Sequence, residues 1–267
     1  MIHSPDAGSD DDFGYSVSLR NGILLIGAPS ESTGGLTNSG VAYIYEAASG
    51  SWQQVARIKP TDLVADAEFG WATAVATDGI TCYVGAPGMS AAYPVRYDTG
   101  HWTAATAWTQ PGSFGWSIAT DQGAVVIGAP WDTNDTGAAY VYPGGERLVA
   151  SPAVVDAWFG FAVGISGNVI VVGSFRENGS GRGVDAPHDN LASHAGAAYV
   201  FEHPSTWQQT HYLKSLNSET YDQFGFSVAI SRDAVVVGAI GEAGSGHGLD
   251  PPDDNLAANA GAAYLFQ

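Results

Sequence analysis

The dipeptide Phe-Gly returns five times along the chain, and each copy opens the same pattern. An aromatic residue and a short apolar run follow every copy, as in the segment FGWSIA that begins at Phe114. A Gly-Ala-Pro-like element starts at the fourteenth residue after the Phe in four copies and two residues later in the second copy. Repeats of about 20–50 residues predict an architecture in which each unit buries its faces against its neighbours. The copies begin at Phe13, Phe69, Phe114, Phe159 and Phe224.

Four of the five repeats also predict four strands, and the last predicts three. Their apolar runs are rich in Val, Ile, Tyr and Phe, which favour strands, and the third run has the form GAAYVF. Turn formers such as Asn21-Gly22 and Asp78-Gly79 separate the first two runs and suit tight hairpins. Pro94 interrupts the third strand of the second repeat, where we expect an irregularity or an outward-facing missing donor. The fourth runs are residues 52–58, 102–108, 147–151 and 207–213.

Four-stranded antiparallel sheets arranged radially are the blades of a β-propeller. The sequence therefore predicts an all-β fold, a β-propeller of five blades in one domain over residues 1–267. The last repeat ends after its third strand, so its blade is expected to be incomplete. Ile2 stands eleven residues before Phe13, as Ile58 does before Phe69, so residues 1–12 match the tail of a fourth strand and its exit loop. We expect a closed five-blade ring, and a piece of a larger propeller is the alternative. The repeats span about 13–68, 69–113, 114–158, 159–223 and 224–267.

The ordered motifs FG-x-S-V-A, GAP and GAAYVF resemble the FG-GAP repeats of integrin alpha-subunit propellers and of many secreted bacterial proteins. The resemblance covers nearly the whole chain. It implies an innermost first strand, Phe-Gly at the rim called the top, and a secreted or cell-surface location. Many integrin blades bind calcium between their first two strands, where this chain has only tight turns, so the resemblance does not extend to that site.

Composition narrows the classes of partner. Nine Lys and Arg against 27 Asp and Glu give a net charge of −18, which opposes binding to nucleic acid or to anionic membranes. No apolar run is long enough for a transmembrane helix. The polar N-terminal segment is unlike a signal peptide, so the protein is either cytoplasmic or has lost a leader, and the family resemblance favours export. Cys82 is the only cysteine and lies in a predicted strand, so it is expected to be a small buried apolar residue.

The aromatic residue after each Phe-Gly is the first candidate binding feature. Similar repeats would place all five at equivalent heights, where they would form a ring around one mouth of the propeller. In integrins, aromatic residues at this position form a cup that receives a basic side chain, so the resemblance implies a cationic partner group, held by cation–π contact. Stacking on a sugar face is an alternative, and packing of the blade ends without a ligand is another. The five residues are Tyr15, Trp71, Trp116, Phe161 and Phe226.

Two long matching insertions, which begin at Glu177 and Glu242, are the second candidate feature. Their carboxylates and amides are the oxygen ligands that calcium prefers, yet neither insertion has the spacing of a known calcium loop. The alternative interpretation is that Asp and Asn form turns by bonding their own backbone. The possible calcium ligands are Asp185, Asp189, Asn190, Asp250, Asp253, Asp254 and Asn255.

The sequence contains no motif of a known catalytic site. Its histidines lack metal-ligand spacing, and no nucleophile elbow is present. The leading hypothesis is therefore a non-enzymatic binding or adhesion module that recognises a protein or carbohydrate partner through the aromatic residues and the two insertions. A carbohydrate-active lyase or hydrolase using Asp or His in the propeller mouth is an alternative. A structural segment of a larger surface protein is another.

Overall fold

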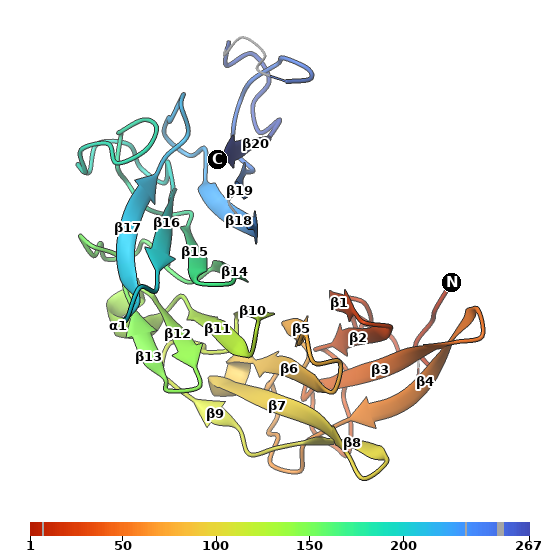
Figure 1. Ribbon diagram of the computed structural model, residues 1–267. Helices are drawn as coiled ribbons and strands as arrows, with labels where there is room; N and C mark the ends of the chain where they lie inside the picture. Colours follow the sequence, from red (N-terminus) through yellow and green to blue (C-terminus); the bar gives the residue numbers. More distant parts are fainter. Residues whose placement is uncertain (7, 233, 250–253) are drawn as a thin grey trace. The chain divides into compact units, whose positions relative to one another are not determined.

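The computed structural model describes residues 1–6, 8–232, 234–249 and 254–267. These residues form five antiparallel sheets and very little helix (Figure 1), which confirms the predicted all-β fold and the five blades of a β-propeller. No helix within these ranges is long and apolar enough to cross a bilayer. The chain divides into two compact units, Met1–Ala129 and Pro130–Gln267. The single domain and the closed ring remain predictions.

The first unit contains two blades and a hairpin. In the first blade the strand order is β1-β2-β3-β4, and in the second it is β5-β6-β7-β8, with β9 also paired to β7. The first blade comprises β1 (Ser16–Arg20), β2 (Ile23–Ala28), β3 (Val41–Ala48) and β4 (Ser51–Ile58). The second comprises β5 (Thr73–Val75), β6 (Thr81–Ala86), η1 (Pro87–Met89), β7 (Ala91–Asp98), β8 (His101–Ala104) and β9 (Trp108–Thr109). The hairpin is β10 (Ser117–Asp121) and β11 (Ala124–Ala129).

The second unit begins with the other half of the third repeat and continues through two blades. The blades have strand orders β14-β15-β16-β17 and β18-β19-β20. The half repeat comprises α1 (Asp132–Asp135), β12 (Ala138–Tyr142) and β13 (Glu146–Leu148). The fourth blade comprises β14 (Ala162–Ser166), β15 (Val169–Ser174), β16 (Ala197–Glu202) and β17 (Gln208–Leu213). The fifth comprises β18 (Phe224–Ser231), β19 (Ala234–Ala239) and β20 (Ala262–Phe266).

The outer strand of the second blade was predicted wrongly as one continuous run over residues 102–108. It is two pieces, β8 and β9, both paired with β7. Pro94 lies in β7 opposite Tyr83, and its carbonyl accepts a hydrogen bond from Ala105 at 2.8 Å. The backbone groups of Pro94 therefore face outward, as expected, and the outer strand is interrupted where the proline has no N–H to offer.

The prediction of strand structure near the N-terminus was also wrong. The described residues of the segment 1–12 form no strand. Ile2 instead packs against a cluster of the first blade that includes Tyr43, and Asp6 lies 2.9 Å from the Arg57 guanidinium. A side-chain anchor of this kind holds the segment without backbone pairing.

Packing between consecutive blades forms the core. In the first unit, Leu25 and Ile44 of the first blade share one buried cluster with Val84 and Tyr93 of the second. Cys82 belongs to this cluster and is fully buried, as predicted. In the second unit, Val171 and Val200 of the fourth blade join Val235 and Val237 of the fifth. Within each unit, two consecutive blades thus share one buried core, as the repeat pattern predicts.

Candidate binding surface

Each Phe-Gly dipeptide lies in a turn that fixes the aromatic residue after it. In the second repeat, the N–H of Trp71 donates to the carbonyl of Glu68 at 3.1 Å. Phe69 between them is fully buried and packs edge-on against Tyr93, with the ring centroids 5.3 Å apart. The residue before Phe has a positive φ in all five repeats: Asp12 (56°), Glu68 (57°), Ser113 (55°), Trp158 (57°) and Gln223 (58°). The aromatic side chain is therefore positioned by its backbone.

The first unit gathers its three predicted binding aromatics into one row. The centroids of Tyr15 and Trp71 are 4.6 Å apart, and those of Trp71 and Trp116 are also 4.6 Å apart. The rings of the two pairs are tilted at 44° and 41° to each other. Tyr15 is 51% exposed and the two tryptophans are partly exposed. The row Tyr15–Trp71–Trp116 is thus a continuous aromatic surface open to solvent.

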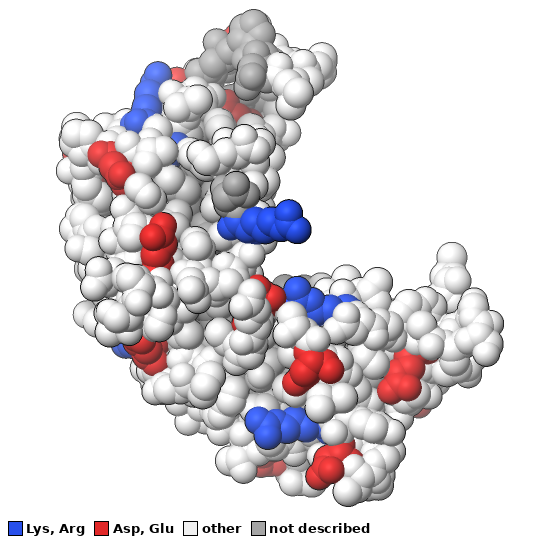
Figure 2. Space-filling view, viewed as in Figure 1, with Lys and Arg blue, Asp and Glu red and all other residues white. Residues whose placement is uncertain are grey.

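Carboxylates accompany this aromatic row. Burial first, and then the charges of Glu68 and Asp12, raise the pKa of Tyr15. Burial and the charge of Asp66 raise the pKa of Glu68 above its ordinary value of 4.5. On the face shown in Figure 2, the described Asp and Glu side chains are scattered rather than gathered in one acidic patch. The charges of Glu68 and Asp12 act at Tyr15, and they favour a cation over the ring faces.

The second unit arranges its aromatics differently. Phe161 and Phe226 lie 5.2 Å apart, and Phe175 contacts both at 4.5 and 5.4 Å. Trp158 contacts Phe175 at 5.5 Å, and it also packs against Trp131 at 5.0 Å. The predicted pair therefore belongs to a five-ring cluster. Each unit thus has its own aromatic group, a row in the first and a cluster in the second, and the single ring of five aromatics remains a prediction.

The cluster carries its own cation. The Arg176 guanidinium carbon lies 4.4 Å from the centre of the Trp158 ring. Its Nη2 lies 3.5 Å from Nε2 of His194. Burial first, and then the positive charge of Arg176, lower the pKa of His194. A neutral imidazole nitrogen can accept from the guanidinium, so the cluster differs in charge from the acid-flanked row of the first unit.

In both insertions, one candidate calcium ligand accepts hydrogen bonds from a serine of its own loop. Asp189 accepts from the backbone N–H and the hydroxyl of Ser180, both at 2.7 Å. Asp254 makes the same pair of contacts to Ser245. Asp185 accepts from the Tyr212 N–H, and Asn255 donates to Glu219. Asn190 makes none of these contacts, and Asp250 and Asp253 lie outside the described residues.

Hydrogen bonds from serine hold the pKa of Asp189 and that of Asp254 below the ordinary value. The described part of the chain contains no group of three or more His, Cys, Asp or Glu side chains placed to hold a metal. The geometry suits the turn-forming interpretation of the carboxylates, and calcium binding remains a prediction.

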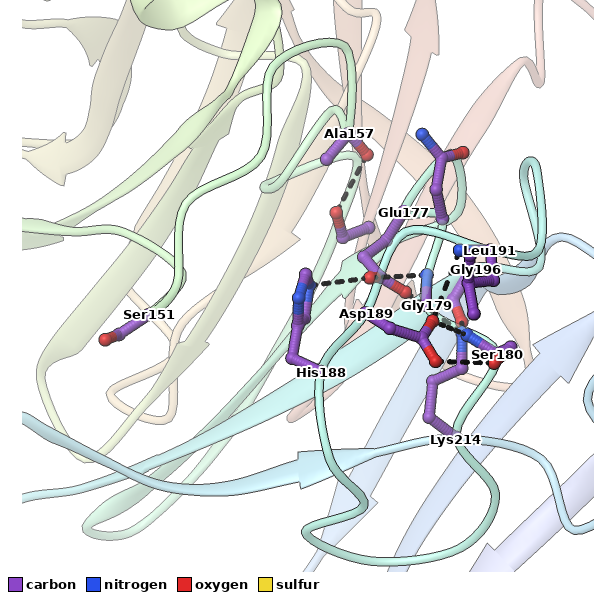
Figure 3. A network of polar contacts seen from close by, with 12 residues as sticks. Ser151, Ala157, Glu177, Gly179, Ser180, His188, Asp189, Leu191, Gly196 and Lys214 are labelled. Atoms are coloured by element: carbon purple, nitrogen blue, oxygen red, sulfur yellow. Dashed lines mark hydrogen bonds and ion pairs between the residues drawn. The ribbon is translucent and has the colours of Figure 1, made fainter.

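A buried ion pair closes the first insertion (Figure 3). Lys214 Nζ lies 2.9 Å from Glu177 Oε2 and donates to the Gly196 carbonyl at 2.6 Å. The other carboxylate oxygen of Glu177 accepts from the Gly179 N–H at 2.7 Å and lies 2.8 Å from His188 Nε2. Glu177 and Lys214 are fully buried. Burial lowers the pKa of Lys214, and the charge of Glu177 opposes that shift.

Glu177 occupies a position that holds a carboxylate in most repeats, which was not predicted from the sequence. Glu31 accepts from Tyr43 at 2.7 Å and from Arg57 at 2.6 Å. Asp132 accepts from Tyr140 and Arg147, and Glu242 accepts from Tyr264 at 3.0 Å. The signal that could have revealed this position is its spacing, four residues after the Gly of the GAP element in every repeat. Its occupants are Glu31, Met89, Asp132, Glu177 and Glu242.

The sole cysteine is not an activated nucleophile. Burial, followed by the charge of Asp78, raises the pKa of Cys82 to about 12. A thiol of this kind stays protonated near neutrality.

Comparisons with known proteins agree with the repeat pattern. A family model described as the FG-GAP repeat matches residues 1–45, 111–142, 145–201 and 207–266, which is more than half of the chain. Most of the second repeat lies outside the match, in agreement with its Met89 and its interrupted outer strand. Among curated protein sequences, none matches the chain.

The solved structures include a similar fold. The periplasmic gluconolactonase PpgL of Pseudomonas aeruginosa aligns with a TM-score of 0.55 and 12% identity over 84% of this chain. The chain spans 64% of the length of that protein. At this identity the similarity concerns the fold.

Proposed function

Because this chain belongs to the FG-GAP repeat family of β-propeller proteins, we propose that it is a non-enzymatic binding module. Its partner docks on the row Tyr15–Trp71–Trp116 and presents a cationic group, most simply an Arg or Lys of another protein. A secreted or cell-surface location is part of the proposal, and the family resemblance supports it.

One observation supports this function best: the rings of the row follow one another at 4.6 Å and remain partly exposed. Blade packing alone would favour aromatics covered by their neighbours, as the Phe of each Phe-Gly is in the second, third, fourth and fifth repeats. A guanidinium over such a surface gains about 0.5–2 kcal/mol from one ring face, and more when it is desolvated. Asp12 and Glu68 strengthen the attraction because their charges act at Tyr15.

The proposal is tested with two short peptides that differ only in charge, Gly-Gly-Arg-Gly-Gly and its citrulline counterpart. Tryptophan emission follows the titration, because Trp71 and Trp116 lie in the row. The binding module predicts that the Arg peptide changes the emission at concentrations where the citrulline peptide does not. Equal responses to both peptides, or no response to either, would contradict a cation site.

An enzyme acting on a sugar derivative is the alternative, and the observation that favours it is the fold shared with a gluconolactonase. It predicts hydrolysis of gluconolactone by the purified protein at a rate above that of buffer. The binding module predicts the buffer rate. Glu68→Gln removes a carboxylate whose charge acts at Tyr15. Turnover by the unmodified protein that is lost in this variant would support the enzyme instead.

A further inference from the structure

The five-ring cluster of the second unit contains two enclosed donors for which the described residues offer no acceptor. Trp158 Nε1 and Arg176 Nε are both shielded from solvent, and neither has a hydrogen-bond partner within the described ranges. Buried N–H groups are bonded in the great majority of cases. Here two such groups belong to side chains in direct contact, since the guanidinium lies over the Trp158 ring.

The backbone at Trp158 is unusual as well. Trp158 has a φ of 57°, and the left-handed region is uncommon for a bulky residue. The corresponding position in the other four repeats is polar in every case, with Asp, Glu, Ser and Gln. An indole in this conformation indicates that the ring serves a purpose that a polar side chain could not.

The surroundings define the chemistry of a ligand. Phe161 and Phe175 contact Trp158, and Phe226 contacts both of them. All three are partly exposed, so apolar ring faces lie near a permanent positive charge. Nε2 of the His194 imidazole lies 3.5 Å from Nη2 of the guanidinium. Asp156 is the carboxylate whose charge acts on His194, and it is exposed. A ligand for these groups must offer acceptor oxygens together with an apolar face.

We propose that the cluster around Trp158 and Arg176 binds an acidic sugar, with the uronate carboxylate on the guanidinium and the sugar ring against the phenylalanine faces. A carboxylate can take Nε–H and an Nη–H of arginine together, which a hydroxyl cannot do. Because Arg176 Nε is enclosed, the guanidinium turns toward the ligand when it binds. This movement changes the environment of the Trp158 indole. The site uses other residues and the opposite charge from the row Tyr15–Trp71–Trp116, so it goes beyond the function proposed above.

The test is a titration with glucuronate and with glucose at physiological ionic strength, followed by tryptophan emission. Physiological salt limits the general repulsion from a chain of net charge −18. Glucuronate is expected to bind at least about tenfold more tightly than glucose, because only it forms a charged pair with arginine. Equal affinity for the two sugars, or binding of neither, would overturn the proposal. Binding of a Glu-rich peptide without binding of glucuronate would also overturn it.

Three variants separate the site from general charge and from misfolding. Arg176→Met removes the guanidinium and is expected to weaken glucuronate binding by about tenfold or more. Arg182→Met removes the same charge from an exposed position in the adjoining insertion and is expected to leave the affinity unchanged. Trp158→Asn removes the indole ring and substitutes a residue that tolerates a positive φ. This variant is expected to stay folded and to lose both glucuronate binding and the emission change. Equal losses in the two arginine variants would contradict a local site.

Discussion

The carbonyl oxygen of Gly225 lies 2.1 Å from the point that a Cβ on Gly173 would occupy. Gly173 belongs to the GAP-like element of the fourth repeat and Gly225 to the Phe-Gly of the fifth. In the same way, a Cβ on Gly27 would lie 1.9 Å from the carbonyl oxygen of Gly70. The two motifs that define the repeat are therefore the two halves of one contact between successive blades.

Gly173→Ala tests this contact. We expect it to destabilise the protein by about 3 kcal/mol, because backbone rather than a flexible side chain must move. Gly244→Ala is the matched control, since its Cβ would meet only Glu242 Oε1 at 3.7 Å and its φ is ordinary. Chemical denaturation measures both. Similar small losses for the two variants would contradict the account of the motif.

The pair of Glu177 and Lys214 makes a second prediction. Removing one partner with Lys214→Met leaves a fully buried carboxylate and is expected to cost about 3–5 kcal/mol. The double variant Glu177→Gln with Lys214→Met is expected to lose less than the sum of the single variants, because neither charge is then stranded. Urea denaturation of the four proteins in the cycle gives the coupling. Additive losses would show that the contact does not close the insertion.

The fold could be predicted from the sequence because its determinants are local. Within one turn Phe69 is buried and Trp71 is partly exposed. The separation of these two aromatic residues by one glycine is visible in the sequence. The repeated carboxylate was missed because its cationic partners vary in position: Arg57 precedes the apolar residue that closes its strand, whereas Lys214 follows Leu213. The interruption of the outer strand beside Pro94 depends on pairing across the sheet, which periodicity along one strand does not reveal.

Calcium provides a third prediction. Asp189 and Asp254 already accept hydrogen bonds from Ser180 and Ser245, so calcium would have to displace these donors. We expect the same thermal midpoint with millimolar calcium and with EDTA, since an ion that does not bind the folded state cannot raise it. A midpoint that rises with calcium and no longer rises in Asp189→Ala would show that the insertion is a metal site.

The affinity of the row for a cation should depend on pH through Glu68. Burial, and then Asp66, raise the pKa of Glu68 above 4.5, so this carboxyl takes up its proton at a higher pH than an ordinary glutamate. Affinity for the Arg peptide is expected to be highest near neutrality, where Glu68 is charged, and to fall as the pH decreases toward this raised pKa. Glu68→Gln should bind more weakly near neutrality and lose this part of the pH dependence. An unchanged profile in the variant would place the titrating group elsewhere.

The most direct test of the proposed function is the affinity of the Arg peptide for two tryptophan variants. Trp71→Ala removes the centre of the row, and Trp52→Ala removes a partly exposed tryptophan on β4, where the structure places no aromatic row. We predict that binding weakens by about tenfold in Trp71→Ala, which corresponds to the loss of about 1.4 kcal/mol of cation–π contact, and stays unchanged in Trp52→Ala. Equal affinity in both variants and in the unmodified protein would contradict the aromatic row as the binding surface.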